Sequence, residues 1–233
     1  MSVGIVIPFY KKSEQLKKCN EALSKQTYKD IETFIHDNSE NNLGFTKAVN
    51  IGLRKYLNKT YTIVLNQDCY LKPDAIEKMV KFMDEHTNCA IGGIKQISVN
   101  NPDFILHGGC TMAFPQGRHI IGSQGRKDCS VSLKMPWVNG AVLIVRNSLI
   151  PEFGLMDENF FLIGSDSDWC YAARQRGCEV WYIAEAECSH EDDGISKVSS
   201  DLALTARMRL DMVYFADKWI TDGCFRELSL EVF

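Results

Sequence analysis

The chain has 233 residues, a net charge of −4 and 45% hydrophobic residues, which fits one large globular domain or two small ones. The acidic balance gives no support for nucleic-acid binding, and no apolar run is long enough to span a membrane. Because residue 1 leads directly into a strand-like segment, we expect no signal peptide. Nine cysteines without a Cys-x-x-Cys pair indicate reduced thiols and a cytoplasmic location.

The first part of the chain alternates between strand and helix patterns. Short apolar runs predict strands at residues 3–8, 31–35, 62–65 and 90–94. Apolar residues at helical spacing predict helices that follow the first three of these strands. An alternation of this kind predicts a parallel sheet with helices on its faces.

The pattern weakens between Lys95 and Lys134, where we expect short antiparallel strands or a mobile loop. Beyond this segment, apolar runs predict strands at 141–145 and 179–184. A helix is expected between them, from about Asp168 to Arg176, and Gly177 is a suitable residue to end it.

A long helix is expected from Ser200 onward. Its apolar stripe from Leu204 to Trp219 predicts packing against the domain or against a dimer partner. We therefore expect a main domain at residues 1–198 and a helical extension at residues 199–233.

Polar clusters follow two of the predicted strands. The strand at 62–65 runs into Asn66-Gln67-Asp68, and the strand at 31–35 runs into a segment that contains Asp37. Ligands of open α/β sheets bind beyond the carboxyl ends of the strands, and a carboxylate there can hold Mg²⁺ or Mn²⁺ and, through it, a diphosphate. Taken alone, the triplet fits a turn equally well, because Asn and Asp are common turn residues.

Seven motifs occur in a characteristic order along the chain. They are Pro-x-Tyr at 8–10, Asp-Asn-Ser at 37–39, Asn-x-x-Gly-Phe at 41–45, Asn-x-Asp at 66–68, Asn-Gly-Ala at 139–141, Asp-Glu-x-Phe-Phe at 157–161 and Ser-Asp-x-Asp-Trp at 165–169. With the late His190, this series resembles glycosyltransferase family 2, in particular its rhamnosyl- and galactosyl-transferase types. The resemblance covers residues 3–190. It implies an inverting enzyme with the α/β GT-A fold, which has a mostly parallel central sheet, flanking helices and here a C-terminal helix.

The resemblance also implies a role for each matching position. Asp166 matches the catalytic base, and Asp68 matches the metal ligand, with His190 completing the shell around Mn²⁺ or Mg²⁺. Trp137, Asn139 and Asp168 would face the sugar or the acceptor. The residues expected to bind the nucleotide are Pro8, Phe9, Tyr10, Asp37, Asn42, Gly44, Lys47 and Asn66.

The chemistry of inverting transfer requires both kinds of acidic residue. One carboxylate must accept the proton of the acceptor hydroxyl, and a cation must balance the charge on the departing diphosphate. Asp166 and Asp68 would meet these two needs. Two positions depart from the family pattern, since Ser165 replaces a Glu and Asn66 replaces an Asp. Ser165 makes the acceptor contacts less transferable, and Asn66 weakens the attraction for a cation.

Simpler interpretations exist for individual residues. Asp166 could cap a helix, with Asp168 competing for that position, and Asp37 could belong to a turn. His190 could be a surface residue of the acidic loop that follows it. Trp137 could be an ordinary core aromatic residue.

The expected function is metal-dependent transfer of a sugar from a UDP- or dTDP-linked donor to a glycan, lipid-linked or protein acceptor, in surface polysaccharide assembly. We expect a cytoplasmic protein, with peripheral contact to the inner face of the membrane and homodimer formation both open. One alternative is a nucleotide-sugar binding module without catalysis, which Ser165 keeps open. A nucleotidyltransferase is disfavoured, because residues 8–13 lack the glycine-rich loop that would hold a triphosphate.

Overall fold

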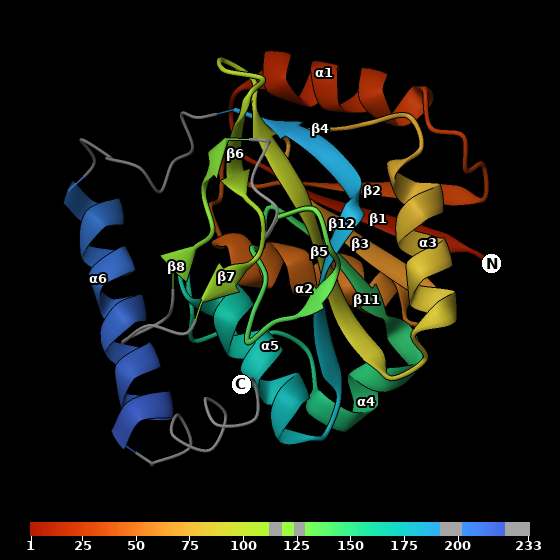
Figure 1. Cartoon of the computed structure of the whole chain (residues 1–233). Coiled ribbons are helices and arrows are strands. Elements are labelled where there is room, and N and C mark those ends of the chain that lie inside the picture. The colour runs from red at the N-terminus through yellow and green to blue at the C-terminus, as the bar shows by residue number, and fades with distance from the viewer. Residues whose placement is uncertain (112–117, 124–128, 192–201, 222–233) are drawn as a thin grey trace.

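A central sheet covered by helices on both faces forms the computed structural model (Figure 1), which describes residues 1–111, 118–123, 129–191 and 202–221. The strands are β1 (Val3–Phe9), β2 (Ile31–Asp37), β3 (Tyr61–Leu65), β4 (Cys69–Leu71), β5 (Cys89–Ser98), β6 (Phe104–His107), β7 (Cys110–Thr111), β8 (Arg118–His119), β9 (Gly122–Ser123), β10 (Leu133–Lys134), β11 (Val142–Arg146) and β12 (Glu179–His190). The helices are α1 (Ser13–Ser24), α2 (Phe45–Tyr56), α3 (Ala75–Glu85), α4 (Ile150–Phe153), α5 (Ser165–Gln175) and α6 (Leu202–Ala216), with a 3₁₀ helix at Asn147–Leu149 and a π-helical segment at Asp217–Thr221 that continues α6.

The direction of the strands determines which loops meet at one edge of the sheet. The order is β10-β12-β5-β11-β3-β1-β2, in which β1 pairs in parallel with β2 and β3, and β12 pairs in parallel with β5. β11 is antiparallel to both of its neighbours, β3 and β5. The carboxyl ends of β1, β2, β3, β5 and β12 therefore lie at the same edge as the amino end of β11. The expected mostly parallel centre is confirmed for these strands, whereas the marginal strands β4, β6, β9 and β10 pair in antiparallel fashion.

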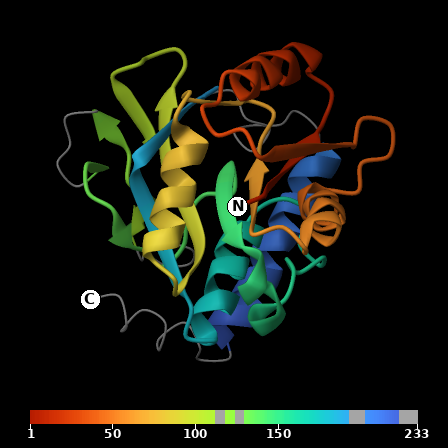
Figure 2. The same cartoon turned by 90° about the vertical axis from the view of Figure 1, so that its right-hand side faces the viewer.

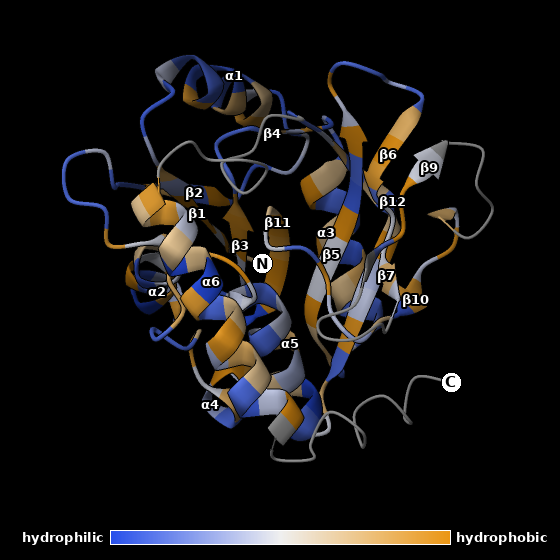
Figure 3. Ribbon diagram, turned by 90° about the vertical axis from the view of Figure 1, so that its left-hand side faces the viewer, coloured by the Kyte–Doolittle hydropathy of each residue, from blue (hydrophilic) through white to orange (hydrophobic). Residues whose placement is uncertain are grey.

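Apolar side chains on both faces of the sheet explain the continuous hydrophobic runs of the central strands. Every residue of β3 is buried, as expected for a strand covered on two sides. One core cluster joins the strands to α1 and α3, and a second joins them to α2, α5 and the chain after α6. Figure 2 shows α1 and α3 from their own side, and Figure 3 shows apolar colouring concentrated on the inner strands.

Two glycines allow α2 to lie unusually close to β1. A Cβ atom on Gly52 would lie 2.4 Å from Val6, and one on Gly4 would lie 2.3 Å from Tyr56. These contacts fix the position of the helix, whose amino end begins directly after the loop at 38–44.

The predicted break in the alternation is confirmed, because β6 to β10 are short and antiparallel where they pair. Strand β12 is longer than the sequence indicated. We expected His190 in an acidic loop, but it is the last residue of β12, where it pairs with Cys69 of β4 and Ser98 of β5. Pairing on both sides explains why the polar end of this segment remains a strand.

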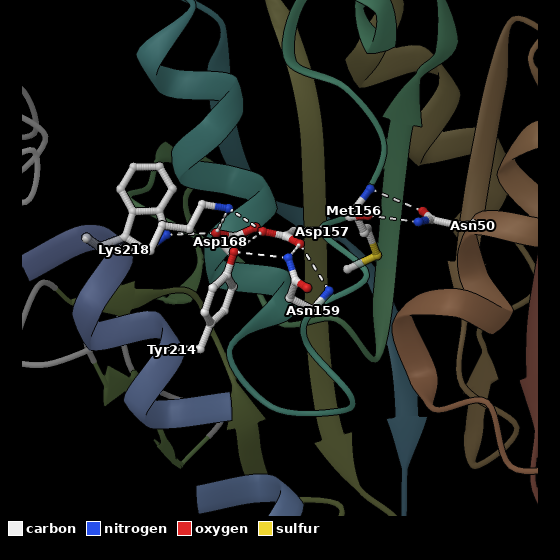
Figure 4. Close-up of polar contacts among 8 residues, drawn as sticks. Asn50, Met156, Asp157, Asn159, Asp168, Tyr214 and Lys218 are labelled. Atoms are coloured by element: carbon white, nitrogen blue, oxygen red, sulfur yellow. Dashed lines mark hydrogen bonds and ion pairs between the residues drawn. The ribbon is translucent and has the colours of Figure 1, made fainter. Parts of the chain in front are cut away.

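The C-terminal helix packs against its own chain. Lys218 Nζ lies 2.8 Å from Asp157 Oδ2 and 2.7 Å from Asp168 Oδ1, and Trp219 Nε1 donates to Asp168 Oδ1 at 2.8 Å (Figure 4). In the expected apolar stripe, Trp219 is buried, as is Phe215. The predicted boundary at 198/199 falls outside the described residues. None of the helices described is both long and apolar enough to cross a membrane.

Candidate active site

A cavity of about 900 Å³ opens at the edge of the sheet where the carboxyl ends of the parallel strands meet. Its lining comes from the ends of β1, β3 and β12, from the loop before β11 and from the start of α5. The cavity therefore collects residues that lie far apart in the sequence. Ten of the residues predicted for the site line it: Pro8, Tyr10, Asn42, Gly44, Asn66, Asp68, Trp137, Asn139, Asp166 and His190.

Asp68 and His190 form the metal-binding half of the site. His190 Nε2 lies 3.6 Å from Asp68 Oδ1, and this buried carboxylate oxygen has no hydrogen-bond partner among the described residues. Cys69 is close to both, but its soft sulfur is a poor ligand for a hard divalent cation such as Mg²⁺ or Mn²⁺. The residues that fit a hard divalent cation are thus one carboxylate and one imidazole, with room in the cavity for further oxygen ligands.

A chain of hydrogen bonds determines which nitrogen of His190 faces Asp68. The backbone N–H of Ala141 donates to Asn139 Oδ1 at 2.9 Å, so the Gln96 atom 3.0 Å from the same oxygen must be the donor Nε2. Gln96 Oε1 therefore faces His190 Nδ1, at 2.9 Å, and this nitrogen must carry the hydrogen.

The consequence is that His190 Nε2 presents a lone pair to the Asp68 carboxylate. Two acceptors that face each other at 3.6 Å repel unless a cation or a proton lies between them. Histidines that bind metals commonly donate their second nitrogen to a neighbouring oxygen, as His190 does here to Gln96. The geometry fits a divalent metal bound by Asp68 and His190.

Asp166 lies at the start of α5, where its carboxylate is held by backbone groups. Oδ2 accepts from Gly140 N at 2.8 Å, and Oδ1 accepts from Ser167 N at 2.8 Å. These bonds hold the side chain between the loop at 139–141 and the helix, and the half-buried Asp166 lines the cavity. The position suits a group that accepts a proton from a bound hydroxyl. The neighbouring Ser165 is buried and donates to Leu162 O at 3.2 Å.

The expected nucleotide side of the cavity is shaped by two amides that sequence reasoning missed. Gln67 bonds to both backbone groups of Tyr10, accepting from its N–H at 2.6 Å and donating to its carbonyl at 3.2 Å. Asn38, which is 4% exposed, donates to Gly44 O at 3.1 Å and accepts from Leu43 N at 3.2 Å. Both amides hold backbone segments. They lie within the Asp-Asn-Ser and Asn-x-Asp motifs, but no role was predicted for either side chain, because their partners depend on the folded chain.

Trp137 fits both of its proposed interpretations. It is 3% exposed and belongs to the hydrophobic core, yet it also forms part of the cavity lining. Only a small part of its indole surface can therefore meet a bound molecule.

Four predicted site residues lie outside the cavity lining. Three of them were predicted to bind the nucleotide: Phe9, Asp37 and Lys47. Asp37 and Lys47 are exposed, and Asp37 Oδ1 accepts a hydrogen bond from Ser39 N at 2.8 Å. The residue of this strand end that does line the cavity is Asn38.

Asp168, predicted to face the sugar or the acceptor, does not line the cavity. Its carboxylate is 2% exposed and points to the opposite side of α5, where it bonds to Lys218 and Trp219 (Figure 4). Burial raises the pKa of Asp168, and the nearby Lys218 ammonium opposes that shift. The expectation failed because residues two apart on a helix face different directions, so Asp166 and Asp168 cannot both point into the cavity.

Asp211 of α6 is a further residue that sequence reasoning missed. Its carboxylate is 3% exposed and accepts three backbone N–H groups, from Phe161 at 2.8 Å, Leu162 at 2.8 Å and Ile163 at 3.0 Å. The loop at 161–163 lines the cavity, so the C-terminal helix sets the shape of one wall. The sequence feature that could have identified Asp211 is that it is a single acidic residue within the predicted apolar stripe of this helix.

Comparison with known proteins supports the resemblance that the motifs indicated. The family model described as glycosyl transferase family 2 matches residues 34–131, which include the loop at 38–44 and the Asn-x-Asp segment. No curated protein matches the chain in sequence.

Solved structures share the fold. GalNAc-T7, solved with UDP, GalNAc and Mn²⁺, is 16% identical with a TM-score of 0.63, over 90% of this chain and 47% of that one. TarS 1-349 from S. aureus, solved with UDP, is 16% identical with a TM-score of 0.60, over 91% of this chain and 65% of that one. This chain thus spans less than two thirds of the solved chains it resembles. The expected GT-A fold is confirmed, and the match to the glycosyltransferase family 2 model supports the predicted resemblance over residues 34–131.

Proposed function

We propose that this chain, which matches glycosyltransferase family 2 over residues 34–131 and has the GT-A fold, transfers a sugar from a nucleoside diphosphate to an acceptor hydroxyl. The observation that carries the proposal is that one cavity holds the Asp68–His190 pair and, separately, the Asp166 carboxylate. Both groups are needed for a displacement at a sugar carbon. Asp68 Oδ1 has no hydrogen-bond partner among the described residues that would give it a purely structural role.

The chain's own residues have distinct tasks in this reaction. Asp68 and His190 would hold Mn²⁺ or Mg²⁺, which supplies positive charge to the diphosphate as it departs. Gln96 keeps His190 in the tautomer that can bind the ion. Asp166, held by Gly140 N, accepts the proton of the acceptor hydroxyl as that oxygen attacks the sugar. Attack from the face opposite the diphosphate inverts the configuration of the sugar carbon.

The finer assignments remain predictions. GalNAc-T7 and TarS were both solved with UDP, which supports a UDP donor over the dTDP alternative. A hexosyl or rhamnosyl donor, a glycan, lipid-linked or protein acceptor, and a place in polysaccharide assembly follow from the resemblance alone. Cytoplasmic location, peripheral membrane contact and homodimer formation also stay predictions.

A binding module without catalysis is the second candidate. Ser165 favours it, because the buried serine takes the place of a glutamate and bonds only within its own loop, to Leu162 O among the contacts described. The two candidates differ in a measurable way, since only the enzyme hydrolyses or transfers a bound donor.

The first experiment is calorimetric titration with UDP, dTDP and GDP, each with Mn²⁺ and again with EDTA. We expect one nucleotide to bind, with affinity falling at least about tenfold in EDTA because the diphosphate loses its cation. Asp68→Asn should remove the metal dependence. The matched control Asp30→Asn changes an exposed carboxylate far from the cavity lining and should bind as the unmodified protein does. Failure of all three nucleotides to bind the folded protein would refute the proposal.

The second experiment separates catalysis from binding. Asp166→Asn should lower donor hydrolysis or transfer by about 100-fold or more, as expected for loss of a general base, while the nucleotide Kd changes less than about twofold. Equal loss of binding and turnover would contradict the role given to Asp166. No turnover by the unmodified protein, despite tight nucleotide binding, would favour the binding module.

A further inference from the structure

Two histidines that the proposed reaction does not use lie side by side at the cavity wall. His107 ends β6 and is 1% exposed, whereas His119 ends β8, is exposed as a residue and contributes to the cavity lining. Their Nδ1 atoms are 2.9 Å apart. Since a buried histidine is costly unless it is paired, the arrangement calls for an explanation.

The hydrogen bonds determine the tautomer of both rings. The backbone N–H of Asn139 points at His107 Nε2 at 3.4 Å, so this nitrogen is an acceptor. A neutral imidazole carries one hydrogen, which must then lie on His107 Nδ1. This N–H donates to His119 Nδ1, and the hydrogen of His119 consequently lies on Nε2.

Both rings are held in the neutral form. Burial lowers the pKa of His107 well below its usual value. A proton added to His119 Nδ1 would face the His107 N–H across 2.9 Å, which would break the bond between the rings. Desolvation by neighbouring groups lowers the pKa of His119, and the Asp166 carboxylate opposes that shift.

The surroundings fix the orientation of His119. The ring of Trp137 meets His119 edge to face, with centroids 5.1 Å apart at 82°, and it lies 6.3 Å from the ring of His107. The same Asn139 that bonds to His107 through its backbone also accepts from Gln96 through its side chain. The imidazole of His119 therefore belongs to the same set of contacting side chains that orients the metal-binding histidine.

We propose that His119 Nε2–H is a neutral donor to a hydroxyl of the transferred sugar and that His107 is the positioning residue that holds this tautomer. The inference rests on the proposed function for its ligand. His119 lines the same cavity as Asp166, Asp68 and His190, so its ring borders the space in which the sugar of the proposed donor would lie. A neutral donor recognises a hydroxyl there without adding a positive charge that would pair with Asp166.

The tautomers are tested first, without any ligand. Long-range ¹H–¹⁵N correlation of the histidine rings at neutral pH should show the hydrogen on Nδ1 of His107 and on Nε2 of His119. In His107→Phe the signals of His119 should average between tautomers, whereas a purely structural role for His107 would leave them unchanged. A hydrogen on Nδ1 of His119 in the unmodified protein would overturn the inference.

The sugar contact is tested by comparing each nucleotide with its sugar-bearing form. UDP-galactose, UDP-N-acetylgalactosamine and dTDP-rhamnose are titrated against UDP or dTDP. We expect His119→Phe to weaken the sugar-bearing ligand about tenfold while leaving the free nucleotide unchanged, and His119→Gln, which keeps an N–H donor, to stay within about threefold.

The outcomes distinguish the two proposals. Equal changes for sugar-bearing and free nucleotide, or no change for either, would overturn the role of His119. Failure of every nucleotide to bind the unmodified protein would instead overturn the proposed function, and the tautomer measurement would still decide whether His107 positions His119.

Discussion

Lys218 is the residue whose removal should most damage the attachment of the C-terminal helix. Its ammonium lies 2.7 Å from Asp168 Oδ1 and 2.8 Å from Asp157 Oδ2, and Asp168 is 2% exposed. Lys218→Met keeps the apolar stem but leaves the buried Asp168 with the Trp219 N–H as its one side-chain partner among the described residues. Removing one partner of a buried ion pair costs about 3–5 kcal/mol, because the other charge remains in an apolar environment.

That loss should be visible as a fall in thermal stability. For a domain of this size, each kcal/mol corresponds to about 2–4 °C, so the Tm of Lys218→Met should fall by about 6–20 °C. The Asp157 contact adds little to this figure, since its side chain is 22% exposed and the solvent screens it.

The stability loss of Lys218→Met should also depend on pH, in a direction set by the pKa of Asp168. Burial raises the pKa of Asp168 in the folded protein, so the stability linked to this group is present below the unfolded pKa and is lost as pH rises through the folded pKa. Without Lys218 the folded pKa rises further. The deficit of the variant should therefore be largest near pH 7 and should shrink toward pH 4, close to the unfolded value for Asp of about 3.9.

Asp157 also makes the stability loss of Lys218→Met larger at neutral pH than in acid. Although burial opposes the effect, hydrogen bonds that include that of Lys218 lower the pKa of Asp157 in the folded protein. This contribution is present above the unfolded pKa and is lost as pH falls through the folded one. Because the unmodified protein loses this stabilisation in acid, its stability advantage over Lys218→Met also becomes smaller there.

Urea unfolding at pH 7 and pH 5, with a thermal melt at each pH, measures the effect. The control is Lys81→Met, since Lys81 is 75% exposed and 3.9 Å from Glu85, and it should change stability by less than about 0.5 kcal/mol. A loss below about 1 kcal/mol for Lys218→Met, or an equal loss at both pH values, would refute the reasoning.

Three further changes test how the cavity wall is supported. Asp211→Asn removes the charge that accepts three N–H groups of the loop at 161–163 and should cost about 1–3 kcal/mol and weaken nucleotide-sugar binding; an unchanged melting temperature would contradict it. Asn50→Leu breaks the two-way bond to the Met156 backbone (Figure 4), and urea unfolding should show a loss of about 2–4 kcal/mol. Gly44→Ala should lower the Tm and nucleotide affinity together, because φ is +88° and a Cβ would lie 2.6 Å from the carbonyl oxygen of Phe161; normal binding would count against a role for this turn.

Sequence patterns predicted the fold well where each element has its own signal. The buried run of β3 and the Asn-x-Asp that follows it placed Asp68 correctly at the edge of the sheet. His190 was assigned to a loop, because the polar end of β12 is stabilised by pairing with β4 and β5, which is invisible in a local pattern.

Residues that act through distant partners could not be predicted. Gln67, Gln96 and Asn38 are ordinary amides in the sequence, and their importance arises only when the fold brings a backbone group or a histidine within hydrogen-bond distance. Asp168 shows the opposite error. Its place in a motif suggested the cavity, but helix geometry turned it toward Lys218.

The loop at 139–141 should limit how the sequence of this site can change during evolution. Its backbone fixes both halves of the site, since Gly140 N–H holds Asp166 and Ala141 N–H begins the chain of bonds that reaches His190. Substitutions here should show strong epistasis with changes at either half, because contacts within one network do not contribute additively. Lineages that alter donor or acceptor preference would then change the surrounding walls and keep this loop nearly constant.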